Sequence, residues 1–308
     1  MPLHVATEFG IGAMTGLLDC CLFHWVDTLK VRRQDGRPLL MDTRTRLPLN
    51  RNQLGSPRFA LSAIASLYAG FSTNLSLKLP YMAFMFAFNA FNQRLLSSSF
   101  GSGADGSASA ASKLAAAAMV GFEVSLLLSP LEMVRIQGQN CGKGGLISAS
   151  RAIARLGDGS VRGWLGVWSR GLTATALREV KYCCGQFFLC DKISQTISGG
   201  AGPVSLKHQV VGAVCGGVIC TIISHPDDVI KTRMQTHLKG SEKCAHYATY
   251  TASARYIVQT EGITALFRGS FFRCLLRVPL GLSVIIVASS WLRAKIDENP
   301  RSYASGHR

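Results

Sequence analysis

Three pairs of opposite charges recur at one spacing along the chain. An acid is followed three positions later by a base at three places: Asp27 and Lys30, Glu132 and Arg135, and Asp228 and Lys231. Residues three apart on a helix lie on the same face, so each acid and its base point the same way. Pro130 and Pro226 stand two residues before the second and third acids, where a proline bends a helix. Such charges predict reversible ion pairs between helices.

Covalent chemistry has no comparable basis in this sequence. It contains no phosphate-binding loop, nucleophile elbow or metalloprotease motif. The ten cysteines include adjacent pairs at 20–21 and 183–184, but no spacing that suits a zinc site. We therefore expect no enzymatic activity, no cofactor and no metal site.

The charge pairs also mark an internal repeat. The three acids divide the 308 residues into comparable units, which we place at 1–100, 101–200 and 201–308. Each charged segment ends in a glutamine, and a later segment of each unit ends in a glycine. The glutamines are Gln34, Gln139 and Gln235, and the glycines are Gly70, Gly171 and Gly269. The third unit has the clearest copy, whereas the first has Trp25 in place of the proline.

Together these residues resemble the mitochondrial carrier family, whose repeat has a proline, an acid and a base at this spacing, then acid-glycine and aromatic-base-glycine segments. The resemblance covers nearly the whole chain. It implies an all-α membrane protein with six transmembrane helices in three pseudo-threefold repeats around a central cavity, with short surface helices on the matrix side. It also implies a multi-pass protein of the mitochondrial inner membrane that moves a small solute by alternating access, often in exchange for another.

Charge placement excludes the main alternatives. A net charge of +16 and a mean hydropathy of only +0.22 would also suit one or two soluble domains or a nucleic-acid binder. However, the basic residues gather in alternate connections, and the apolar stretches between them run for roughly 20 residues, enough to cross a bilayer. We expect no nucleic-acid partner. The predicted spans are 8–33, 68–96, 113–139, 168–197, 206–235 and 270–293.

The basic connections orient the spans. By the positive-inside rule, connections 33–60, 140–167 and 237–267 face one compartment, which the resemblance implies is the matrix. The weakly charged loops 97–112 and 198–206, and both termini, face the other side. Residues 56–66 are predicted to form a short surface helix. Small residues at Gly12 and Gly16, and again at Gly212 and Gly216, predict close helix packing.

The resemblance implies a ring of ion pairs that closes the cavity on the matrix side. Its expected pairs are Asp27 with Arg135, Glu132 with Lys231, and Asp228 with Lys30, braced by Gln34, Gln139 and Gln235. The corresponding motif at the opposite end is incomplete at 88–92, 190–194 and 289–293. We therefore expect the ion pairs there to be largely missing and the cytosolic barrier to be weak.

The substrate site is predicted around Arg178 and Glu179, seven residues after Gly171 on the fourth span, a position that faces the cavity in the family. Arg178 can bind a carboxylate through two N–H groups, and Glu179 can bind an ammonium or sulfonium. The pair is similar to that of carriers for amino acids or S-adenosylmethionine. The supporting candidates are Arg277, Lys78, Asp19 and Tyr182, with Lys181 and Arg273 behind them.

Two alternatives stay open from the sequence. Several bases and few acids at the membrane depth of the predicted substrate site would also suit a di- or tricarboxylate as the substrate. The incomplete cytosolic motif would suit a transport-inactive receptor or scaffold of the same fold. The resemblance further implies that cardiolipin headgroups bind near Gly70, Gly171 and Gly269, because helix N-termini bind anions. We expect a monomer.

Overall fold

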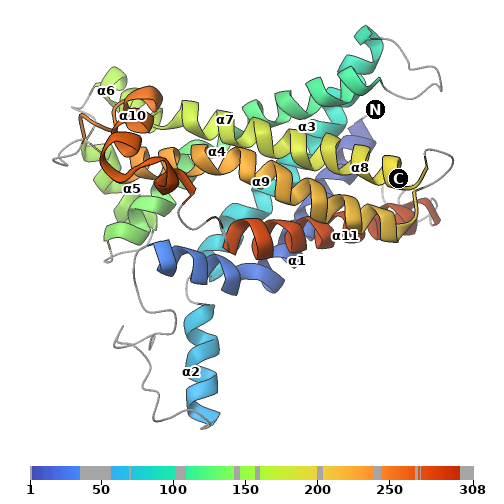
Figure 1. Cartoon of the computed structure of the whole chain (residues 1–308), viewed down its shortest axis with the longest axis horizontal. Helices are drawn as coiled ribbons and strands as arrows, with labels where there is room; N and C mark the ends of the chain where they lie inside the picture. The colour runs from blue at the N-terminus through green and yellow to red at the C-terminus, as the bar shows by residue number, and fades with distance from the viewer. Residues whose placement is uncertain are drawn as a thin grey trace, which may run out of the picture.

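The computed structural model describes residues 2–34, 57–68, 71–100, 109–141, 146–156, 160–199, 204–238, 244–267, 270 and 272–298. These ranges contain helices and turns but no strand. Six long helical segments follow one another in the predicted order and run side by side in Figure 1. They are α1 (Pro2–Gln34), α3 (Phe71–Phe100), α4 (Ala110–Cys141), α7 to α8 (Leu172–Cys184 and Cys190–Ile197), α9 (Leu206–Thr236), and α11 (Val278–Glu298). The predicted all-α fold with six spans is confirmed in the described ranges.

Four of these helices are long and apolar enough to cross a membrane by themselves. The qualifying stretches are His4–Leu29, Ala110–Val134, Leu206–Thr236 and Val278–Ile296. Helices α3 and α7 instead carry ionisable side chains along their length, among them Lys78 on α3 and Arg178 and Glu179 on α7. Ionisable groups in a membrane-spanning helix face protein or water rather than lipid. These two helices are therefore the ones expected to present the site.

Short helices occupy the basic connections, as predicted. They are α2 (Pro57–Leu67), α5 (Leu146–Arg155), α6 (Val161–Trp168), α10 (Tyr250–Glu261) and the 3-10 helix η3 (Ile263–Phe267). Side-chain caps start two of them: the Ser160 hydroxyl accepts from the Gly163 N–H at 3.0 Å, and the Thr249 hydroxyl from the Ala252 N–H at 3.3 Å. Helices α5, α6 and α10 gather at the left end of the bundle in Figure 1, and α8 lies toward the other end.

Glycines allow the long helices to pack closely. A Cβ at Gly12 of α1 would lie 2.4 Å from the Met82 carbonyl oxygen of α3, and one at Gly216 of α9 would lie 2.7 Å from the Cys190 Sγ. Contacts this short exclude a side chain at either position. The close helix packing predicted from the small-residue spacing is thus present between α1 and α3 and between α9 and α8.

Two π-helical turns interrupt the even-numbered spans. The first, η2 (Gly185–Leu189), joins α7 to α8, and the second, η4 (Phe272–Arg277), leads into α11. Pro279 has no N–H for the carbonyl of residue 275, so the α-helical hydrogen-bond ladder is broken where η4 ends. A π-turn holds more residues than an α-turn, which changes the face on which Arg277 projects.

Candidate substrate site and gate

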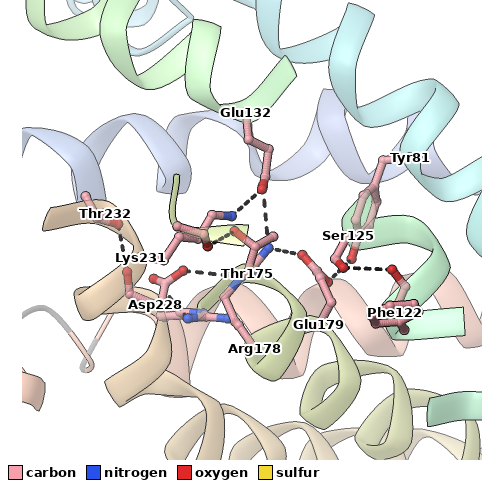
Figure 2. Close-up of polar contacts among 12 residues, drawn as sticks. Tyr81, Phe122, Ser125, Glu132, Thr175, Arg178, Glu179, Asp228, Lys231 and Thr232 are labelled. Atoms are coloured by element: carbon pink, nitrogen blue, oxygen red, sulfur yellow. Dashed lines mark hydrogen bonds and ion pairs between the residues drawn. The ribbon is translucent and has the colours of Figure 1, made fainter. Parts of the chain in front are cut away.

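Arg178 lies between three carboxylates (Figure 2). Its guanidinium contacts the Glu179 carboxylate directly, while its Nη2 is 3.4 Å from Glu132 Oε1 on α4 and its Nε is 3.7 Å from Asp228 Oδ1 on α9. Helix α7 begins at the turn formed by Gly171, whose φ of 79° favours glycine, and carries Arg178 towards α4 and α9. One guanidinium therefore connects the predicted substrate pair with two acids of the predicted gate.

Glu179 is buried and held from a second helix. The Tyr81 hydroxyl on α3 donates a hydrogen bond to Glu179 Oε2 at 2.8 Å. Tyr81 was not among the predicted site residues, although it lies three positions after Lys78 on the same helix face. The Glu179 carboxylate thus accepts hydrogen bonds from Arg178 of its own helix and from Tyr81 of α3.

Glu132 and Lys231 form the predicted contact between the second and third repeats. Lys231 Nζ bonds directly to Glu132 Oε2, and only 5% of the lysine side chain is exposed. The other two predicted pairs cannot be placed in full, because the side chains of Lys30 and Arg135 lie outside the described residues, as do those of Gln34 and Gln139. Gln235 is buried below Gly171, where a Cβ would come within 3.1 Å of the glutamine Cγ.

A second charged cluster surrounds Asp19 in the middle of α1. Arg277 donates from Nη1 and Nη2 to the two Asp19 oxygens at 2.8 and 2.7 Å, and from Nε to Asp27 Oδ1 at 2.7 Å. Lys78 Nζ on α3 lies 2.8 Å from Asp19 Oδ2. Arg277, Lys78 and Asp19 are therefore brought together, and the described partner of the gate acid Asp27 is Arg277.

The remaining candidates fall in different surroundings. Arg273 lies 2.9 Å from the second oxygen of Asp228, so it belongs to the Arg178 cluster. Tyr182 packs against the apolar cluster formed by residues such as Met85 and Cys183 and contacts none of the charged residues through a hydrogen bond in the described ranges. Its ring thus lies on the core side of α7.

One charged group in this region was not predicted at all. Asp227 is buried, and its carboxylate accepts from Lys181 Nζ of α7 and from the Tyr250 hydroxyl of α10, both at 2.7 Å. Burial and this hydrogen bond raise the pKa of Tyr250 to about 12, so the phenol stays protonated and donating at physiological pH. The only sequence signal was that the third charged segment has an acid directly before Asp228.

Charges in the two clusters balance. The acids are Asp19, Asp27, Glu132, Glu179 and Asp228, and the bases are Lys78, Arg178, Lys231, Arg273 and Arg277, five of each among the side chains that the structure describes. This count leaves out the gate bases Lys30 and Arg135, whose side chains lie outside the described residues, so the expectation of several bases and few acids stays a prediction.

The cytosolic end also differs from the expectation. Arg293 of α11 forms a bidentate pair with Glu8 of α1 at 3.0 and 2.8 Å. In addition, Lys113 of α4 lies 3.5 Å from Asp191 of α8, and Asn92 donates to Glu123 at 2.9 Å. The prediction that ion pairs are largely missing there is wrong. Glu8 lies in the first span and Lys113 and Glu123 lie in the third span, whereas the motif was sought only in the second, fourth and sixth spans.

Gly121 sets the distance between α4 and the site-bearing helix α7. A Cβ at this position would lie 2.5 Å from the Val180 Cα and 2.7 Å from the Glu179 backbone carbon, and backbone atoms cannot move aside as a side chain can. We expect Gly121→Ala to lower the free energy of unfolding by about 1–3 kcal/mol and to reduce uptake, because α7 is displaced at Glu179. Thermal unfolding of the purified protein measures the first effect.

Gly10→Ala is the matched control for this prediction. It also replaces a helical glycine, but a Cβ there would meet no atom within 4 Å. We expect it to leave uptake unchanged and to stabilise α1 slightly, by about 0.5–1 kcal/mol. Equal destabilisation by the two substitutions would mean that close packing at Gly121 is not what holds α4 and α7 in place.

The predicted lipid-binding glycines are only partly described. Gly171 closes the turn before α7, where its carbonyl accepts from the Thr175 N–H at 2.9 Å. Gly70 and Gly269 lie outside the described residues. Lipid binding at all three therefore stays a prediction.

Comparison with known proteins shows similarity to carriers of mitochondria. The sequence model of the family described as "Mitochondrial carrier protein" matches residues 202–289, which lie in the repeat with the clearest charge motif. The chain is 28% identical to the rat mitochondrial glutamate carrier 2 over 238 residues, covering 70% of this chain and 72% of that protein.

Other relatives differ in the solute that their names give. A probable mitochondrial 2-oxodicarboxylate carrier of Schizosaccharomyces pombe is 23% identical, covering 91% of this chain and 90% of that protein. The mitochondrial glycine transporter of Mycosarcoma maydis is 26% identical, covering 77% and 66%. In its repeated charge motif, its six helical segments and its sequence, the chain is thus similar to the mitochondrial carrier family.

Proposed function

We propose that this protein carries a small amino-acid-type zwitterion across the mitochondrial inner membrane by alternating access. The observation that carries the proposal is the adjacent pair of Arg178 and Glu179, held between α3, α4 and α9. A substrate carboxylate takes the place of Glu179 on the Arg178 guanidinium, and a substrate ammonium takes the place of Arg178 on Glu179. Arg178 thereby keeps a carboxylate partner, and Glu179 keeps a cationic partner.

Arg178 also couples substrate binding to the proposed gate. Its guanidinium is 3.4 Å from Glu132, which holds Lys231. When a substrate carboxylate draws Arg178 away, Glu132 loses one of its two cations and Asp228 loses a neighbour, so the matrix-side contacts weaken. A ligand shifts an equilibrium between two conformations only by its differential affinity for them. Rearranged contacts of Arg178 would supply that difference.

The rest of the proposed machinery follows the repeat pattern. The ring would be completed by Asp27 with Arg135 and by Asp228 with Lys30, and Gln34, Gln139 and Gln235 would brace it. The three repeats would act as one transmembrane unit and one monomer. Cardiolipin headgroups would bind to backbone N–H groups near Gly70, Gly171 and Gly269.

A di- or tricarboxylate is the second candidate, and the name of the fission yeast relative favours it. The adjacent pair of Arg178 and Glu179 argues for the zwitterion instead. A carboxylate and an ammonium each find an opposite charge at this pair, whereas a second carboxylate would lie close to Glu132, Glu179 and Asp228. A zwitterion adds no net charge. An S-adenosylmethionine-like solute has the same carboxylate and ammonium, with a sulfonium in addition.

Uptake by the purified protein in liposomes tests the proposal. The panel consists of labelled glycine, glutamate, S-adenosylmethionine, 2-oxoglutarate and ATP, each measured with and without the unlabelled compound inside. We expect the fastest uptake for a compound with one carboxylate and one ammonium. Preference for 2-oxoglutarate would favour the dicarboxylate carrier, and uptake of none of these compounds would favour a receptor or scaffold.

A further inference from the structure

Asp19 is the most completely buried charge in the protein's described spans. Its side chain is 0% exposed, yet it lies in the middle of α1, away from both ends. Two cations from two other segments hold it: Lys78 from α3 and Arg277 from the end of η4. An isolated charge at this depth would be unstable, so these contacts are required for α1 to keep an aspartate there.

Arg277 already uses three of its five N–H donors on carboxylates of α1. Its Nη1 and Nη2 donate to Asp19, and its Nε donates to Asp27. The Phe23 ring centroid is 5.5 Å from its Cζ, and a Cβ at Gly281 would lie 2.5 Å from its Nη1. The guanidinium is thus enclosed on several sides in the geometry that a carboxylate prefers.

Arg178 is held less tightly by the other helices. Its direct partner, Glu179, is its neighbour on α7, whereas its contacts with Glu132 and Asp228 are 3.4 and 3.7 Å long, and its Nε has no hydrogen-bond acceptor among the residues that the structure describes. With 13% of its side chain exposed, it is buried enough for a charged contact to be strong. The two arginines at this depth therefore differ: Arg178 can exchange its neighbour Glu179 for a substrate carboxylate, whereas Arg277 is fixed to α1 by three short hydrogen bonds.

We propose that Asp19 determines substrate specificity by acting as a resident carboxylate on Arg277 and Lys78. It occupies the second cationic position of the site, so that a substrate finds one available guanidinium and can bring only one uncompensated carboxylate. This inference rests on the proposed function, which it deepens by excluding substrates with a second carboxylate. Asp19 does not contact the substrate itself, and it acts through the two bases that it neutralises.

Substitution of Asp19 by asparagine tests this role. The amide has nearly the same shape but no charge, so Lys78 and two N–H groups of Arg277 become available to an anion. We expect Asp19→Asn to raise the ratio of 2-oxoglutarate uptake to glycine uptake by about tenfold or more, as expected for a new charged hydrogen bond. Glutamate uptake should rise relative to glycine in the same way.

The double variant Asp19→Asn/Lys78→Met restores the charge balance. We expect it to return the ratio towards that of the unmodified protein, whereas a purely structural role of Asp19 predicts no such return. Asp191→Asn is the matched control, because it removes an acid from a helix of the same bundle whose contact with Lys113, at 3.5 Å, lies far along α8 from Arg178. It should leave the ratio unchanged.

Gly281→Ala keeps the inference testable if Asp19→Asn fails to fold. The added methyl group displaces the Arg277 guanidinium from Asp19 without changing any charge, and it should raise the same ratio by a smaller factor. An unchanged ratio in the folded variants, with glycine uptake intact, would overturn the role of Asp19 alone. Unmodified protein that takes up 2-oxoglutarate but not glycine would overturn the proposed function as well.

Discussion

Replacement of Arg178 by alanine is expected to lower zwitterion uptake on the order of 100-fold, because the substrate carboxylate loses its guanidinium and Glu179 is left buried without its cation. Both effects act at one residue, which makes this the largest change that a single substitution should cause. Initial rates of labelled substrate uptake into liposomes, at equal amounts of reconstituted protein, measure it. An uptake rate within about threefold of that of the unmodified protein corresponds to a free-energy difference of less than about 1 kcal/mol, and it would show that Arg178 does not bind the substrate.

Two further variants separate binding from folding at this position. Arg178→Lys keeps the charge but not the planar fork, so we expect it to recover only part of the lost uptake. Arg178→Ala/Glu179→Gln removes both charges, so it should recover thermal stability relative to the single variant, since no buried charge is left alone. It should not recover uptake. Recovery of uptake in this double variant would mean that the pair is structural.

The fold was predictable from the sequence because three repeats gave the same result independently. Charged segments in phase, basic connections on alternate sides and apolar stretches of membrane length all indicated six spans, and the described helices follow that order. The irregular turns were not predictable. The π-helix η4, which ends at Arg277, was found only in the structure.

The site was predictable only as far as the repeat determines it. The family resemblance implied that Glu132 would meet Lys231, and the structure places them in contact. Partners such as Asp19 for Arg277, or Glu8 for Arg293, depend on how α1 is rotated against α11. The spacing of residues along one helix does not give this rotation, because it depends on how the side chains of neighbouring helices pack together. The contacts of Asp19 with Arg277 and of Glu8 with Arg293 were therefore missed.

Disruption of the contact between Glu132 and Lys231 is expected to produce the second large effect. Lys231→Met keeps the aliphatic length and removes the ammonium, which leaves Glu132 with Arg178 as its described cation. We expect the free energy of unfolding to fall by about 2–3 kcal/mol, somewhat less than for a fully buried pair, since 27% of the Glu132 side chain is exposed. Uptake should fall as well, because the matrix side no longer closes firmly between transport steps.

A double-mutant cycle distinguishes this gate contact from two unrelated charges. Glu132→Gln alone leaves Lys231 buried without its carboxylate, whereas Glu132→Gln/Lys231→Met leaves neither charge unpaired. The double variant should therefore be more stable than the sum of the single effects predicts, with a coupling of about 1–3 kcal/mol in thermal unfolding measurements. Strictly additive effects would show that the contact contributes nothing to closure. A matched cycle on Lys113 and Asp191, which are 3.5 Å apart and more exposed, should give a coupling below about 1 kcal/mol, because water screens that pair.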